Sequence, residues 1–98
     1  MKTIYKYPLD LQDTILIEMP ANSKILHIGT HGGDLCDQTF CWVIVDTEEK
    51  IIKRKIKMFG TGQDIKFFGF ARDWEFISTV QYQGGKLVFH FFDTQEET

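Results

Sequence analysis

The stretch that decides the fold is Lys50-Ile51-Ile52-Lys53-Arg54-Lys55-Ile56-Lys57-Met58-Phe59. Basic and apolar residues alternate along it, and successive side chains of a β-strand point to opposite faces of the sheet. The pattern predicts a strand with one basic face and one mainly apolar face. The basic face has Lys53, Lys55 and Lys57, and the other face has Ile52, Arg54, Ile56 and Met58.

Two-residue alternation recurs along most of the chain. The segments expected as strands are 3–7, 14–19, 24–30, 39–46, 50–59, 74–82 and 86–92. Pro8 and Pro20 stand at strand ends, and the continuously apolar run 39–46 is expected at the centre of a sheet. Thr47–Glu49 reads as a hairpin turn, and Gln83–Gly85 as a tight turn that uses glycine at positive φ.

No segment has the apolar stripe of a helix, so the expected fold is all-β and mainly antiparallel. It is a small sandwich or barrel of six or seven strands, with room for one short helical turn within 62–73. We expect one domain at 1–93 and a frayed acidic tail at 94–98. The expected core includes Ile15, Ile17, Leu26, Ile28, Val43, Val45, Leu87 and Phe89.

Composition limits the possible partners. The formal net charge of −3 argues against a general binder of duplex nucleic acid. The chain has no apolar run near the roughly 20 residues of a membrane span, and no secretory signal, which points to a reducing cytoplasm. Nine Phe among 98 residues is a surplus for so small an interior, so we expect a homo-oligomer with aromatic residues at its interface.

A glycine-rich turn, Gly60-Thr61-Gly62, follows the basic strand directly. Backbone amides in such a turn suit an anion, but glycine also serves simply to bend the chain. The turn is neither a Walker loop nor a dinucleotide fingerprint. The candidate ligand-binding residues are Lys57, Gly60, Thr61, Gly62 and Arg72 for phosphate and Trp74 for stacking on a base.

Metal and catalytic sites are weaker alternatives. His27, His31, Cys36 and Cys41 are possible zinc ligands, but their spacing matches no standard site, and buried core cysteine is the simpler interpretation of Cys41. No signature of a nucleophile, paired carboxylates or metalloprotease motif is present. We therefore expect no catalytic residue, no metal and no cofactor, and a protein that is not an enzyme.

Blocks along almost the whole chain resemble small proteins of tailed bacteriophages. The blocks are Ile4-Tyr5-Lys6-Tyr7-Pro8-Leu9, Ile17-Glu18-Met19-Pro20-Ala21, Lys24-Ile25-Leu26, Trp42-Val43-Ile44-Val45-Asp46, Phe59-Gly60-Thr61-Gly62 and Gly84-Gly85-Lys86-Leu87-Val88-Phe89-His90. That group looks like viral nucleotide sponges, which sequester the cyclic-dinucleotide signals of CBASS-type bacterial immunity. Loop 31–38 and segment 64–73 depart from the pattern.

The resemblance implies a non-catalytic protein that binds a cyclic di- or trinucleotide in the cytoplasm of an infected bacterium. A chain of this size does not enclose such a ligand alone, so a two-fold assembly would supply matching halves of the site. The alternative is a phage protein-interaction or virion accessory module that has no nucleotide ligand and uses its Phe-rich segment as a contact surface.

Overall fold

A computed structural model of the protein describes residues 1–30, 38–65 and 73–98, and it confirms the all-β fold. The elements are β1 (Lys2–Leu9), β2 (Thr14–Pro20), β3 (Lys24–Thr30), β4 (Thr39–Asp46), β5 (Ile51–Gly60), β6 (Glu75–Tyr82), a 3-10 turn (Gln83–Gly85) and β7 (Leu87–Glu97). Each of the seven segments expected from alternation is a strand, with ends that differ from the expected ones by a few residues.

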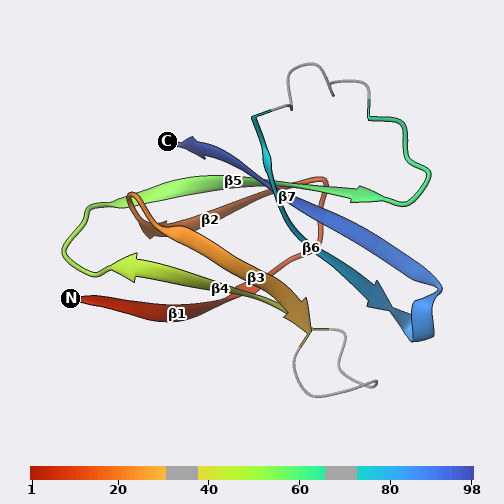
Figure 1. Cartoon of the computed structure of the whole chain (residues 1–98), viewed down its shortest axis with the longest axis horizontal. Coiled ribbons are helices and arrows are strands. Elements are labelled where there is room, and N and C mark those ends of the chain that lie inside the picture. Colours follow the sequence, from red (N-terminus) through yellow and green to blue (C-terminus); the bar gives the residue numbers. More distant parts are fainter. Residues whose placement is uncertain (31–37, 66–72) are drawn as a thin grey trace.

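The strands form two antiparallel sheets, with the orders β1-β4-β3 and β2-β5-β7-β6 (Figure 1). The apolar strand β4 is central in the three-stranded sheet, as expected. Its Cys41, Val43 and Val45 are buried between the sheets, while Trp42 and Ile44 lie on the outer face and Ile44 is 37% exposed. The continuous apolar run therefore has one buried face and one partly exposed face.

The segment Thr47–Glu49 is not the hairpin turn that the sequence suggested. Strand β4 pairs with β1 and β3, whereas β5 pairs with β2 and β7, so this turn takes the chain from one sheet to the other. The Thr47 amide donates to the Met1 carbonyl at 2.9 Å, and the Glu48 amide donates to the Asp46 carboxylate at 3.1 Å. The Glu48 amide, followed by the N-terminal ammonium group, lowers the pKa of Asp46. Figure 1 shows the N-terminus beside this turn.

The two sheets meet along their β3 and β6 edges. The Ile28 amide donates to the Ser78 hydroxyl at 3.0 Å, and both residues are buried. Each strand has a register shift at this contact, between Ile25 and His27 in β3 and between Phe76 and Ser78 in β6. Bulges bend strands and increase their twist, which suits a place where two sheet edges converge.

The expected core is largely confirmed. The buried apolar residues include Ile15, Ile17, Ile28, Val43 and Val45, and Phe89 is partly buried against them. Leu26 was wrongly placed there: it is 41% exposed, because the β3 register shift at this position turns it out of the alternation. Leu87 was also wrongly placed, since it is 43% exposed as the first residue of β7, at the hairpin end of its sheet.

The acidic segment 94–98 was expected to be a frayed tail, but most of it belongs to strand β7. Strand β7 continues to Glu97, and the backbones of Thr98 and Lys53 exchange hydrogen bonds of 3.0 and 2.9 Å. The 3-10 turn at Gln83–Gly85 has Gly84 and Gly85 at φ 66° and 92°, as the glycines there predicted. Residues 62–65 contain no helical turn, and the rest of the segment where one was expected, 66–72, lies outside the described residues. In the described parts of the chain, no helix is long and apolar enough to cross a membrane.

Candidate functional site

The outer face of the four-stranded sheet has a cluster of four aromatic rings, which we call the aromatic face: Phe59, Trp74, Phe76 and Phe92. Phe59 and Trp74 stack with their planes 20° apart and their centroids 6.2 Å apart. Phe92 packs edge-on against Phe59 at 5.9 Å and against Phe76 at 5.7 Å. Phe59 is 9% exposed and Phe76 is 58% exposed, so the cluster has a well-packed base and an open flank.

Strand β5 brings Lys57 to this face. As the sequence predicted, Ile52, Arg54, Ile56 and Met58 are buried while the three lysines of the alternating stripe point outward. Lys53 lies opposite Glu18 in the register, and Lys55 forms an ion pair with Glu96 at 3.2 Å. Lys57 instead donates to the Thr14 hydroxyl at 2.8 Å, and its ammonium lies 5.9 Å from the centre of the Phe59 ring.

The turn Gly60-Thr61-Gly62 uses several of its polar groups internally. The Gly60 amide donates to the Gln63 side-chain oxygen at 2.9 Å, and the Thr61 amide donates to the Val88 carbonyl at 3.3 Å. Gly62 has φ +87°, a conformation that glycine adopts without strain. A ligand at this turn would therefore meet the Thr61 side chain before it met the amides of Gly60 and Thr61.

Of the other two candidates from the sequence, Trp74 is among the described residues and Arg72 is not. Trp74 lies next to β6 and is half-buried on the aromatic face, stacked on Phe59. Arg72 lies outside the described residues, so its expected phosphate contact stays a prediction. The structure thus brings Lys57 and Trp74 together around Phe59.

Sequence reasoning missed His90, which lies beside the aromatic face. Its Nε2 is 2.8 Å from the Thr61 hydroxyl, and its Nδ1 is 2.9 Å from the Thr79 hydroxyl. In the register, His90 is opposite Phe59 on one side and Thr79 on the other. Alternation along β7 would have placed His90 and Phe92 on one face, but only the register between strands shows what they lie beside.

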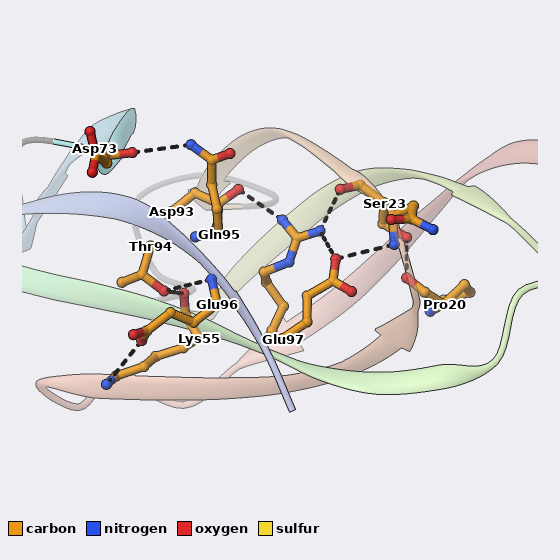
Figure 2. Close-up of polar contacts among 11 residues, drawn as sticks. Pro20, Ser23, Lys55, Asp73, Asp93, Thr94, Gln95, Glu96 and Glu97 are labelled. Atoms are coloured by element: carbon orange, nitrogen blue, oxygen red, sulfur yellow. Dashed lines mark hydrogen bonds and ion pairs between the residues drawn. The ribbon is translucent and has the colours of Figure 1, made fainter.

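A buried ionic cluster around Arg54 was also not predicted from the sequence. Its guanidinium donates to the Asp93 carboxylate at 2.9 Å, to the Ser23 carbonyl at 2.7 Å and to the Glu97 carboxylate at 2.8 Å. Figure 2 shows Ser23, which lies between β2 and β3, converging with Asp93 and Glu97 of β7. The available signal was an arginine on the apolar side of the alternating strand, a place where charged groups need partners.

A surface pocket of about 450 Å³ borders this cluster. Two of its lining residues, Asn22 and Gln95, have positive φ angles of 61° and 63°. The Asn22 amide donates to the Glu97 carboxylate, and the Gln95 amide donates to the Asp93 carboxylate two residues earlier in the chain. Asp93 and Glu97, which line the pocket, already accept donors from the chain, so we assign the cluster a structural role in fastening β7 to β5.

The possible zinc ligands are not gathered together. In the register, Cys41 pairs with Ile28 and His27 pairs with Trp42, which puts Cys41 and His27 on opposite faces of the three-stranded sheet. His31 and Cys36 lie outside the described residues, and among the described ones no group of three or more His, Cys, Asp or Glu could hold a metal ion. Burial raises the pKa of the Cys41 thiol to about 12, which leaves it a poor nucleophile.

The fold and this face define a two-sheet β-sandwich with aromatic, basic and hydroxyl side chains gathered on one outer surface. The whole chain, residues 1–98, matches the family described as Domain of unknown function (DUF7352), and the protein belongs to that family. Neither the curated proteins nor the solved structures contained a match.

Proposed function

We propose that this protein binds a cyclic di- or trinucleotide without cleaving it and so sequesters an immune signal, as an anti-CBASS-type sponge made by a bacteriophage. The phage origin and the cytoplasm of the infected host belong to the proposal, and both come from the sequence resemblance. The aromatic face supplies the binding surface. No reaction is proposed, and unchanged nucleotide after long incubation with the protein is the expected result.

One observation carries the proposal: Phe59 is stacked on Trp74 and lies below the Lys57 ammonium. Rings on a rigid strand offer a flat surface for a nucleobase, and stacking on an aromatic side chain is worth about 1–3 kcal/mol per base. A lysine beside the rings adds attraction for the phosphate. Phe59 is buried and supports the rings around it, so a base would stack on the half-buried Trp74 ring or the exposed Phe76 ring, and this surface is already formed before the ligand arrives.

The spacing along β5 suits a ligand with more than one phosphate. Lys57 and Thr61 are four residues apart, which corresponds to roughly 13 Å in an extended strand. They therefore lie at opposite ends of the aromatic face and contact separate groups of a ligand. A cyclic nucleotide with bases between phosphates has this arrangement of flat and anionic parts.

A homo-oligomer is part of the proposal because the aromatic face is open. Phe76 is 58% exposed, and a second copy placed against it would cover the ligand from the other side. We expect light scattering at micromolar concentration to give at least a dimer. A monomer that still binds a cyclic nucleotide would remove the oligomer from the proposal and leave the binding face.

Tryptophan fluorescence tests the site directly, since the chain has two tryptophans, one on each sheet. The variant Trp42→Phe leaves Trp74 as the reporter, and Trp74→Phe leaves Trp42. We expect a panel of cyclic di- and trinucleotides to quench Trp74 fluorescence and raise the melting temperature, while Trp42 fluorescence is unchanged. If no nucleotide in the panel changes either signal, the proposal is rejected.

Two lysines on the same strand give a matched charge test. Lys57→Gln should weaken nucleotide binding by roughly tenfold or more, because it removes a charge-assisted contact. Lys53→Gln removes the same charge from the same face but opposite Glu18, away from the aromatic cluster, and should weaken binding much less. Equal losses in the two variants would mean that only net charge matters and that Lys57 is no specific contact.

A second candidate is the protein-interaction module without a nucleotide ligand. It is favoured by the outer face of the three-stranded sheet, where Ile4 is 56% exposed and Ile44 is 37% exposed, beside a Lys6 ammonium 4.5 Å over the Phe40 ring. Ile44→Asp should break any assembly formed through this face and leave nucleotide binding unchanged. An assembly lost in Ile44→Asp, together with no response to any nucleotide, would favour this second function.

A further inference from the structure

A row of three polar side chains crosses one end of the aromatic face. Thr61 follows β5, His90 lies in β7 and Thr79 lies in β6, so three separate segments meet at one imidazole. The Thr61 hydroxyl is 2.8 Å from His90 Nε2, and the Thr79 hydroxyl is 2.9 Å from His90 Nδ1. Both contacts are exposed to solvent, so a ligand can reach all three groups.

Hydrogen-bond counting shows that this row has two distinct states. A neutral imidazole has one N–H donor and one acceptor nitrogen, so one threonine donates to the ring and the other accepts from it. A protonated imidazole donates from both nitrogens, so both threonine oxygens become acceptors and both O–H groups are free to turn outward. Protonation therefore creates one positive charge flanked by two outward hydroxyl donors.

Among the described residues, no other charged side chain is a direct neighbour of His90 at this end of the aromatic face. Among the described residues, its outer-face neighbours are Phe59 and Thr61 on the β5 side, Thr79 and Gln81 on β6, and Val88 and Phe92 on β7. Lys57 is one side chain further along β5, opposite Phe92, and Glu75 pairs with Asp93 away from His90. A positive charge on His90 is thus neither neutralised by a paired carboxylate nor opposed by an adjacent lysine in this part of the sheet.

We propose that Thr61, His90 and Thr79 form a phosphodiester-binding site that works with His90 protonated, so that ligand binding takes up a proton. This inference rests on the proposed function: the site receives one phosphate of the nucleotide whose base stacks on the aromatic face. The phosphate accepts from the two hydroxyls and is attracted by the imidazolium, and charge-assisted bonds of this kind are the strong ones. Lys57, at the other end of the face, would attract the second phosphate.

NMR of the imidazole groups tests the site with a probe that has no base. Dimethyl phosphate is a phosphodiester with no proton that titrates between pH 6 and 8, so any pH effect reports on the protein. We expect it to move the His90 imidazole resonances toward those of the protonated ring. His27, which lies on the other sheet and bonds Ser78 through Nδ1 at 3.1 Å, is the internal control and should not move.

Calorimetry with cyclic di-adenosine monophosphate gives the second measurement. Binding at pH 7 should take up protons, seen as a dependence of the heat on the ionisation enthalpy of the buffer. The affinity should fall as the pH rises from 6 to 8, by up to about tenfold per pH unit. His90→Gln keeps a hydrogen-bonding group but no titratable proton, and should remove the pH dependence and lower the affinity at pH 6 by about tenfold or more.

The hydroxyls are tested by Thr79→Val, which keeps the shape of the side chain and the imidazole charge. It should weaken binding a few-fold while proton uptake persists, and Thr79→Ser should restore the affinity. If His90→Gln does not fold, the site is still tested by the imidazole resonances of the native protein and by the two variants Thr79→Val and Thr79→Ser. The inference is overturned if dimethyl phosphate leaves His90 unmoved, or if a nucleotide quenches Trp74 with the same affinity at every pH; in the latter case the proposed function stands without it.

Discussion

Arg54 of β5 and Asp93 of β7 form an ion pair of 2.9 Å whose side chains are only 6% and 5% exposed. The pair lies where β7 leaves regular pairing: Ile56 is opposite Asp93, but Arg54 is opposite Glu97. Three residues of β7 therefore bulge against one residue of β5. The guanidinium spans this bulge, because its fork of donors reaches both ends of it at once.

Asp93→Asn should destabilise the protein strongly. The substitution leaves the buried Arg54 charge with Glu97 as its remaining carboxylate partner among the described residues. Breaking one side of a buried pair typically costs about 3–5 kcal/mol. Urea unfolding followed by circular dichroism should show this loss. Glu96→Gln, which breaks the exposed Lys55–Glu96 pair, is the control and should cost less than about 1 kcal/mol; similar losses in both variants would contradict a special role for the buried pair.

Removing residues 94–98 should also destabilise the protein, although the sequence suggested a frayed acidic tail. The deletion takes away Glu97 from Arg54 and the backbone pair between Thr98 and Lys53. We expect a loss of at least about 2 kcal/mol, or a melting temperature lower by roughly 8–16 °C. Deletion of Thr98 alone removes just the backbone pair and should have a smaller effect. An unchanged melting temperature for the longer deletion would show that the tail contributes nothing.

The strands could be predicted from the sequence because alternation is a local signal. The stretch 50–59 has the pattern of a half-buried strand, and β5 buries the expected side of it. The pairing of the strands is not local. The turn Thr47–Glu49 looks like a hairpin in isolation, but β4 already has a partner on each side, so the chain must cross to the other sheet. The exposure of Leu26 likewise follows from a register shift in β3 that the alternating sequence pattern does not indicate.

The candidate site was predictable in its residue types and less so in its geometry. Lys57 and Trp74 were found because a lysine stripe and an aromatic beside an arginine are visible in the sequence. The stacking of Trp74 on Phe59 depends on where the chain returns after β5. His90 was missed because its threonine partners are 29 and 11 residues away, in segments that only the sheet brings together.

Cys41 should be unreactive in the folded protein. Burial, with the nearby Asp93 charge second, raises the pKa of its thiol from 9.0 to about 12. At pH 8 only about one thiol in ten thousand is then the reactive thiolate. The folded state holds this proton more tightly than the unfolded state, so the contribution of Cys41 to stability is intact below pH 9 and is lost as the pH rises toward 12.

Alkylation with iodoacetamide checks this. In a Cys36→Ser background, Cys41 is the remaining cysteine. Mass spectrometry should find it unmodified after an hour at pH 8 in buffer and fully modified in concentrated urea. Rapid modification of the folded protein would show that Cys41 is accessible, against its 0% exposure.

Ser78→Ala should loosen the contact between the two sheets. The Ser78 hydroxyl accepts from the Ile28 amide at 3.0 Å and also bonds His27 Nδ1 at 3.1 Å, at the point where the β3 and β6 edges meet. Alanine fits the space but leaves the buried Ile28 amide without its acceptor, which costs about 1–3 kcal/mol.

Hydrogen exchange can locate this loss. The Ile28 amide of Ser78→Ala should exchange much faster than in the native protein. The amide of Val43, in the central strand β4, serves as the control. Its exchange rate should change only by the amount that the change in global stability accounts for. A double-mutant cycle with His27→Ala then separates the imidazole contact from the amide contact, because the two share one hydroxyl. Unchanged exchange at Ile28 in Ser78→Ala would mean that the sheets are joined by apolar packing and that this hydrogen bond adds little.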